Sequence, residues 1–170
     1  MFSGYWRLPD KTRAEFRDGY FVTGDVGRFD ERGYLCIVGR GKDLIITGGY
    51  NVYPREVESQ IDALPGVQES AVVGLPHPDF GEGVTALVVV EPSGTNPASG
   101  PAAALTEESV LARLGEILAG YKCPKRVLFL PDLPRNAMGK VQKNLLREQF
   151  KLLYAAAGAQ PGASQPRGGA

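Results

Sequence analysis

The sequence predicts an α+β protein, a short β-sheet with helices packed on it. Two nearly continuous apolar runs, residues 70–75 (SAVVGL) and 84–90 (VTALVVV), are rich in valine and too short for buried helices, so they indicate central strands. Two other segments, residues 54–64 and 106–120, repeat apolar residues at helical spacing. From about residue 44 the expected order is therefore β-α-β-β-α-β-α.

The expected helices have recognisable ends. The first begins at Pro54, since proline suits the first helical position, and ends before the Pro-Gly pair 65–66. Thr106 is expected to cap the second helix, which Gly120 closes. A last amphipathic helix is expected over residues 141–153. The predicted core-facing residues are Val57, Ile61 and Leu64 in the first helix, Val110, Leu111, Leu114, Ile117 and Leu118 in the second, and Leu145, Leu146, Phe150 and Leu153 in the last.

The N-terminal part is expected to be β-rich. Short β-prone runs at residues 21–30, 34–40 and 43–49 are separated by glycine and aspartate, with a hairpin turn predicted at 30–33. VLFL (127–130) indicates one more strand, much later in the chain. Because the first 40 residues can bury little by themselves, they are expected to form the edge of something larger.

Two stretches are too rich in small residues and proline to form a core. Residues 91–104 (EPSGTNPASGPAAA) are expected to be a long flexible connection. Residues 154–170 are expected to be a disordered tail.

Composition excludes several classes of protein. Nineteen basic and nineteen acidic residues give a formal net charge of +0, so no electrostatic footprint for nucleic acid exists. No apolar run is long enough for a membrane helix, and the N-terminal residues are not expected to act as a secretory signal. Cys36 and Cys123 lack C-x-x-C spacing, and His77 is the one histidine, so no metal site is expected. A cytoplasmic location is the expectation.

Two motifs in the N-terminal part could bind polar groups of a ligand. Thr23-Gly24-Asp25 places a carboxylate at a strand edge, where it could accept two hydrogen bonds from a sugar diol, or it is an ordinary turn. In residues 39–43 (GRGKD), Arg40 offers a fork that matches phosphate oxygens, and the flanking glycines would suit a hinge. A hairpin connection with solvated charges is the alternative.

Two later motifs combine glycine with chemistry. Gly48 and Gly49 follow an expected strand, where they would let a ligand approach the backbone or would simply form a strand-to-helix loop. Residues 133–140 (LPRNAMGK) place Lys140 directly after a glycine, either as a presented cation or as a solvated surface lysine. His77 lies between two prolines with no partner carboxylate indicated, which favours a structural role.

The order of the motifs is more specific than any one of them. TGD, GRGKD, GGYNVYPREVE, GLPHPDFGE and LPRNAMGK in this order resemble the acyl-CoA synthetase branch of the adenylate-forming (AMP-binding) ligases, over residues 1 to about 153. Within that family the motifs are most similar to those of malonyl-CoA synthetases. Such enzymes form an acyl-adenylate from ATP and a carboxylate, and then transfer the acyl group to coenzyme A.

The resemblance implies roles for three residues of the N-terminal motifs. Asp25 matches the acid that binds the ribose hydroxyls of ATP or AMP. Arg40 matches the arginine that contacts the nucleotide near ribose and phosphate. Lys42 matches the hinge about which the small C-terminal domain rotates between the two half-reactions.

The later motifs are assigned in the same way. Gly48 and Gly49 match the glycine-rich turn beside the pantetheine tunnel of coenzyme A. Lys140 matches the lysine that reaches the active site for adenylation only. Asn51 stands where some family members carry an arginine, so the coenzyme A or nucleotide contact of that arginine is not expected here.

The resemblance also implies a domain organisation and a set of substrates. Residues 1–41 would be the β-rich edge of a large N-terminal AMP-binding domain, and residues 42–153 a mobile C-terminal domain hinged at Lys42. The ATP phosphate loop and the acyl pocket belong to that large domain, which should precede residue 1. It is thus the expected partner, in cis or as a separate chain, without which the chain would be inactive.

The expected co-substrates are ATP and coenzyme A, with Mg²⁺ held mainly by ATP and the large domain. The acid would be a small carboxylate such as malonate. Two alternatives stay open: a non-catalytic interaction or regulatory module that keeps the ligase fold, and a ligase that uses the arm of a carrier protein.

Overall fold

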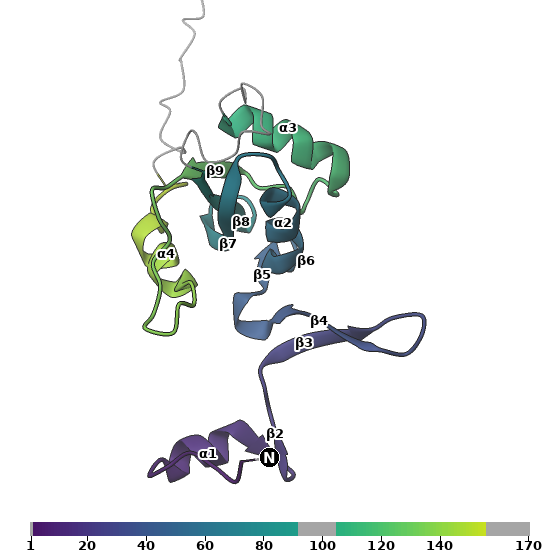
Figure 1. Cartoon of the computed structure of the whole chain (residues 1–170), viewed down its shortest axis with the longest axis vertical. Helices are drawn as coiled ribbons and strands as arrows, with labels where there is room; N and C mark the ends of the chain where they lie inside the picture. The colour runs from purple at the N-terminus through teal and green to yellow at the C-terminus, as the bar shows by residue number, and fades with distance from the viewer. Residues whose placement is uncertain (1, 92–104, 156–170) are drawn as a thin grey trace, which may run out of the picture. The chain divides into compact units, whose positions relative to one another are not determined.

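The computed structural model describes residues 2–91 and 105–155, and these form two compact units, Met1–Asp43 and Leu44–Ala170 (Figure 1). Residues 92–104 and 156–170, which include most of the predicted flexible connection and tail, lie outside the described residues. In the described part of the chain, no helix is long and apolar enough to cross a membrane.

A five-stranded sheet forms the centre of the second unit (Figure 1). Its long central hairpin pairs β7 with β8 from Val67↔Val90 to His77↔Gly81. On the other side of β8, residues 85–88 pair in parallel with β9, and Gly81 pairs with β5. Strand β6 pairs with β5 at the outer edge of the sheet. The bounds are β5 Ile45–Thr47, β6 Tyr50–Val52, β7 Val67–His77, β8 Gly81–Val90 and β9 Arg126–Phe129.

The two apolar runs of the sequence are this central hairpin, which confirms them as core strands. Successive side chains of a strand point to opposite faces of the sheet, and both faces are covered here. Val72 and Val84 contribute to one hydrophobic core, whereas Val73 and Leu87 contribute to the other. Burial on both faces explains why the runs are continuously apolar rather than alternating.

Helices α2 (Pro54–Asp62) and α3 (Glu107–Ile117) cover one face of the sheet, and α4 (Lys143–Phe150) covers the other (Figure 1). The predicted α+β fold is therefore confirmed. The Thr106 cap is confirmed as well, because its side chain accepts a hydrogen bond from the backbone N–H of Ser109.

Two predicted core positions are wrong. Leu145 is 46% exposed, since it points about 100° around α4 from its fully buried neighbour Leu146, away from the sheet. Ile117 is 57% exposed, because it is the last residue of α3 and the backbone becomes extended after it. α4 is also shorter than the predicted helix over 141–153, since it ends at Phe150 and continues as turns.

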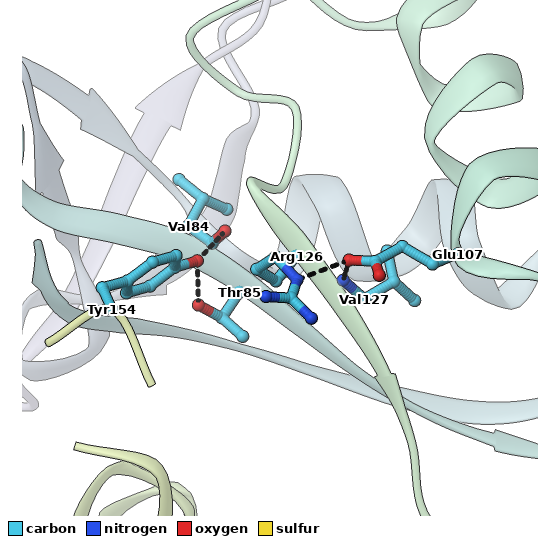
Figure 2. Close-up of polar contacts among 6 residues, drawn as sticks. All are labelled: Val84, Thr85, Glu107, Arg126, Val127 and Tyr154. Atoms are coloured by element: carbon cyan, nitrogen blue, oxygen red, sulfur yellow. Dashed lines mark hydrogen bonds and ion pairs between the residues drawn. The ribbon is translucent and has the colours of Figure 1, made fainter. Parts of the chain in front are cut away.

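Tyr154 corrects the predicted start of the tail. Its side chain is only 5% exposed, and its hydroxyl lies 2.8 Å from Thr85 Oγ1 on β8 (Figure 2). The ring occupies the space above Gly83, where an added Cβ would come within 2.7 Å of it. The chain is therefore held against the sheet at least as far as Tyr154.

Three glutamates hydrogen-bond to backbone N–H groups of the short or outer strands β5, β7 and β9. An unpaired N–H is a liability at the edge of a sheet, and a carboxylate is a strong acceptor for it. The pairs are Glu82 with Ile46 at 2.7 Å, Glu58 with Val72 at 2.8 Å, and Glu107 with Val127 at 2.8 Å. Glu107 also binds Arg126 (Figure 2). Side chains from helices and from β8 thus complete the hydrogen bonding of the sheet.

The first unit is β-rich, as predicted, but it also contains a helix that the sequence reading missed. Its elements are α1 (Pro9–Glu15), β1 (Phe16–Arg17), β2 (Tyr20–Phe21), β3 (Asp25–Phe29), β4 (Leu35–Arg40) and the 3₁₀ turn η1 (Gly41–Asp43). Proline at its first position allows α1 to start without a side-chain cap. The predicted hairpin turn is confirmed between β3 and β4, where Asp30 accepts hydrogen bonds from the backbone N–H groups of Arg32 and Tyr34.

Candidate functional site

Asp25 and Arg40 lie directly opposite each other on β3 and β4. Arg40 Nε is 3.1 Å from Asp25 Oδ1, and the side chains are 64% and 27% exposed, respectively. Fifteen residues separate them in the sequence, so only the hairpin register brings the two predicted nucleotide-binding residues together. The result is an acid and a guanidinium side by side on an open surface.

The turn before β3 fixes the backbone at Asp25. Gly24 has a positive φ of 74°, which glycine adopts at no steric cost, and its carbonyl accepts a hydrogen bond of 2.9 Å from Gly41 N–H. Thr23 Oγ1 accepts a second one, of 3.1 Å, from Asp25 N–H. TGD and the start of GKD are thus joined by backbone hydrogen bonding, which the sequence alone does not show.

Lys42 lies in η1 with an exposed side chain. The division between the two compact units follows Asp43, one residue beyond Lys42. The predicted domain limits at 41/42 and the role of Lys42 as a hinge stay predictions, but the chain does pass from one unit to the other at this motif.

Gly48 and Gly49 form the tip of the β5–β6 hairpin, with φ values of 55° and 83°. Positive φ at both central residues is the pattern of the tight type I′ turn. A strand-to-helix loop is therefore wrong for these glycines, because the strand β6 intervenes before α2; at three residues it is too short to show a periodic pattern. Gly48 N–H donates to the carbonyl of Phe80 at 2.9 Å, and no atom lies within 4 Å of a Cβ added to Gly49.

Lys140 lies at the end of a small hairpin loop between β9 and α4. Asn136 N–H donates to the Lys140 carbonyl at 3.0 Å, and Asn136 Oδ1 accepts from Lys140 N–H at 2.9 Å. Gly139 has a φ of 77°, as expected for the last residue of a three-residue hairpin loop. The Lys140 side chain is exposed, and within residues 2–91 and 105–155 its ammonium has no salt-bridge partner.

The same loop is tied to the sheet by a residue that sequence reasoning missed. Arg135 donates to the carbonyl of Gly139 at 2.8 Å and forms an ion pair with Glu69 on β7. The hydrogen bond and the charge of Glu69 raise the pKa of the Arg135 guanidinium above its ordinary value. Glu69 is 66 residues away from Arg135, and no motif marks it, so no sequence signal could have paired them.

The structure favours a structural role for His77. Its ring packs against Phe80 and Tyr154, with centroids 4.8 and 4.6 Å apart, and its nearest carboxylate is Asp79 at 4.0 Å. Among the residues that the structure describes, no three histidine, cysteine or acidic side chains are grouped so that they could hold a metal ion.

The candidate residues therefore fall into two groups. Asp25, Arg40 and Lys42 belong to the first unit, and Gly48, Gly49 and Lys140 belong to the second. Asp25 and Arg40 lie at strand ends and Lys42 in the 3₁₀ turn η1, whereas Gly48 and Gly49 form a hairpin turn and Lys140 ends a hairpin loop.

The fold and motifs define a small α+β domain with a lysine at the end of an exposed loop, preceded in the chain by a Gly-Lys turn and a β-rich segment. The chain belongs to the AMP-binding enzyme family, because the C-terminal domain model of that family matches residues 56–140. This confirms the resemblance read from the motifs.

The relatives of this chain are ligases and synthetases. The long-chain-fatty-acid–CoA ligase FadD13 of Mycobacterium tuberculosis is 45% identical over 150 residues, which are 88% of this chain and 28% of FadD13. ATP-bound MatB from Rhodopseudomonas palustris is 60% identical, with a TM-score of 0.76, over 90% of this chain and 29% of MatB. The amide bond synthetase McbA from Marinactinospora thermotolerans is 40% identical, with a TM-score of 0.73, over 87% of this chain and 28% of McbA. The chain thus spans less than a third of these proteins.

Proposed function

We propose that this chain acts as the C-terminal portion of an ATP-dependent acid–CoA ligase of the malonyl-CoA synthetase type. Such a ligase converts a carboxylate, ATP and coenzyme A into acyl-CoA, AMP and pyrophosphate. The observation that carries the proposal is the 60% identity to ATP-bound MatB over 90% of the chain. The chain would supply the adenylation lysine and the turn beside the coenzyme A tunnel, and it would need a large N-terminal domain for activity.

The Asp25–Arg40 pair suits the nucleotide. The Asp25 carboxylate has two oxygens that can accept hydrogen bonds from the two ribose hydroxyls. Arg40 contacts Asp25 through Nε, so it orients the acid, and the remaining donors of its guanidinium suit a phosphate oxygen. We assign ribose binding to Asp25 and the phosphate-side contact to Arg40.

Lys140 suits the first half-reaction. Adenylation develops negative charge on the carboxylate, on the α-phosphate and on the departing pyrophosphate. An ammonium with three donors on a flexible stem can serve two of these oxygens at once. A preorganised donor of this kind is typically worth about 10²–10³ in rate. The exposed position on a hairpin loop lets Lys140 enter a site built by another domain.

The second half-reaction needs the cation withdrawn and the thiol admitted. Rotation of the second unit about Lys42 would achieve both steps, since it would remove Lys140 and bring the Gly48-Gly49 turn to the reacting carbon. Glycine at the tip leaves room for the pantetheine arm, because no side chain projects there.

Mg²⁺ is assigned to ATP and the large domain. The described residues of this chain offer no acidic or histidine cluster for a metal ion. No step that we assign to this chain therefore depends on a metal held by its own side chains.

The test is a chimera in which this chain replaces the matching part of R. palustris MatB. AMP release is followed with ATP, Mg²⁺, malonate and coenzyme A. The variant Lys140→Ala should lose about 10²–10³ in the rate of adenylate formation, while acyl transfer from preformed malonyl-AMP to coenzyme A stays nearly unchanged. Lys151→Ala, an exposed lysine paired with Glu148 near the end of α4, is the matched control and should retain both rates. Equal loss of both half-reactions in Lys140→Ala would contradict the assigned role.

A second acceptor class is favoured by the 40% identity to an amide bond synthetase. In that case the adenylate would react with an amine rather than with coenzyme A. The same chimera distinguishes the two, because product formation is measured with coenzyme A, with an amine or with a carrier-protein thiol as the acceptor. A chimera that folds and adenylates no acid would instead favour a non-catalytic module.

A further inference from the structure

The base of the loop that carries Lys140 packs against the sheet, and one side-chain contact reaches its turn. Its ends are fixed by two buried leucines, Leu133 before it and Leu146 after it, which are 1% and 0% exposed. Between them the chain reaches away from the sheet, and its turn residues Ala137, Met138 and Gly139 are exposed. Val141, directly after Lys140, packs against the second hydrophobic core at the base of the loop, so a contact to the turn itself would fix where the tip lies.

Arg135 makes that contact from the base of the loop. One terminal nitrogen, Nη1, donates to the Gly139 carbonyl at 2.8 Å, and the other, Nη2, pairs with Glu69 Oε2. A single planar guanidinium therefore holds the residue directly before Lys140 with one arm and strand β7 with the other. Lysine could not replace it, because an ammonium lacks the rigid two-armed geometry.

Both residues that Arg135 contacts, Glu69 and Gly139, belong to segments held by hydrogen bonds. Glu69 belongs to the central hairpin, opposite Val89 on β8, and its side chain is 23% exposed. Within the loop, Asn136 Oδ1 accepts hydrogen bonds from Met138 N–H and Lys140 N–H, so the turn moves as one body. Holding Gly139 therefore holds the Lys140 backbone.

We propose that Glu69 and Arg135 are positioning residues for Lys140, which fix the direction of its loop relative to the sheet through the Glu69–Arg135–Gly139 connection. This rests on the proposed role of Lys140 in adenylation. The expected effect is kinetic, because a displacement of about 1 Å in a group that acts on the reacting atoms can cost about 100-fold in rate. The thioester step does not use Lys140 and is expected to be insensitive to the connection.

The first experiment measures amide hydrogen exchange in the full chain. In Arg135→Ala and Glu69→Gln the amides of Gly139 and Lys140 should exchange about tenfold faster than in the unmodified chain, while the amides of β7 and β8 keep their rates. Arg113→Ala, an exposed arginine on α3, is the control and should change neither set. Unchanged exchange at Gly139 and Lys140 in both variants would overturn the proposal.

The second experiment measures the two half-reactions in the MatB chimera. Arg135→Ala and Glu69→Gln should each slow adenylate formation about tenfold, a smaller loss than that of Lys140→Ala, and should leave acyl transfer unchanged. Arg135→Lys should recover only part of the rate, since it keeps the charge but not both contacts.

A double-mutant comparison separates positioning from general damage. In the Lys140→Ala background, Glu69→Gln should cause no further loss, because it acts only through the missing lysine. An equal further loss would show an independent structural role and overturn the proposal. If Lys140→Ala itself spares adenylation, the proposed function fails; if it blocks adenylation while Glu69→Gln and Arg135→Ala do not, only the positioning role fails.

Discussion

The two compact units of this chain differ in what they bury. The second unit covers both faces of its sheet and contains two hydrophobic cores. In the first unit no side chain among residues 2–43 is buried, and large apolar side chains are open, with Trp6 84%, Tyr20 79% and Phe29 74% exposed. Strands β3 and β4 form a sheet of two strands only, and most of their side chains are exposed.

This difference indicates that the stability of the first unit depends more on contacts with other protein than the stability of the second unit does. An isolated two-stranded hairpin is marginal in water, whereas a sheet covered by helices is stable by itself. The chain spans 28–29% of the relatives described above, and we expect the exposed apolar side chains of the first unit to lie against the remainder of such a protein. Function would then follow the same division, with one unit built into a large domain and one free to move.

The largest expected effect comes from separating the units. Residues 44–155 alone should unfold in one cooperative thermal transition, because both cores lie within them. Residues 1–43 alone should show no such transition in circular dichroism. A cooperative transition in the short fragment, or its absence in the long one, would contradict the comparison.

The next largest difference between the units is expected when an apolar side chain is truncated in each of them. Leu114→Ala removes a fully buried side chain from α3 and should lower the free energy of unfolding by about 2–5 kcal/mol, measured by denaturant titration. Leu35→Ala on β4 is the matched variant, since Leu35 is 60% exposed, and it should change stability by less than about 0.5 kcal/mol. Similar losses at both positions would show that the first unit also relies on its own packing.

The ion pairs offer a third contrast. Glu58 is nearly buried, binds Lys143 at 2.6 Å and accepts the Val72 N–H, so Glu58→Ala leaves a cation and a backbone donor without their acceptor. We expect a loss of about 3 kcal/mol in the free energy of unfolding. Asp25→Ala breaks a far more exposed pair and should cost less than about 1 kcal/mol. Similar losses of unfolding free energy in Glu58→Ala and Asp25→Ala would contradict this contrast between the buried and the exposed ion pair.

The smallest expected effect concerns Tyr154 and depends on pH. Burial raises the pKa of the Tyr154 hydroxyl above its ordinary value, although the hydrogen bond with Thr85 opposes the shift. The folded state therefore keeps this proton longer than the unfolded state, so stability is fully present below about pH 10 and is lost as pH rises through the folded pKa. Tyr154→Phe should cost about 1 kcal/mol at neutral pH and should flatten the decline above pH 10. Thermal melts of the unmodified protein and of Tyr154→Phe from pH 8 to 11 provide the measurement. If stability falls equally steeply with pH in both proteins, Tyr154 is not the cause of the decline.

Much of the second unit could be predicted because its signals are local. The valine-rich runs at residues 70–75 and 84–90 allow only buried strands, and Thr106 marks a helix start by its own side chain. The three-residue strand β6 could not be predicted, because it shows no periodic pattern. Helix α1 was not predicted, and its seven residues offer only a short signal.

The candidate site divides in the same way. The motifs indicated the candidate residues, because each motif is a short run of adjacent residues that together suggest a chemistry. These residues are Asp25, Arg40, Lys42, Gly48, Gly49 and Lys140. The contacts that support them join residues far apart in the chain. The Glu69–Arg135 pair beside the Lys140 loop is an example, and nothing in the sequence marks it.

The sequence by itself determined the fold class, the central strands, the family and the motifs that hold the proposed site residues, because these depend on local patterns of residue type. Only the tertiary structure decided which residues meet: the register that sets Asp25 beside Arg40, the glutamates that bind strand N–H groups, and the arginine that holds the Lys140 loop. The physical reason is that such contacts form between residues far apart in the sequence, and local patterns of residue type do not encode which distant segments meet.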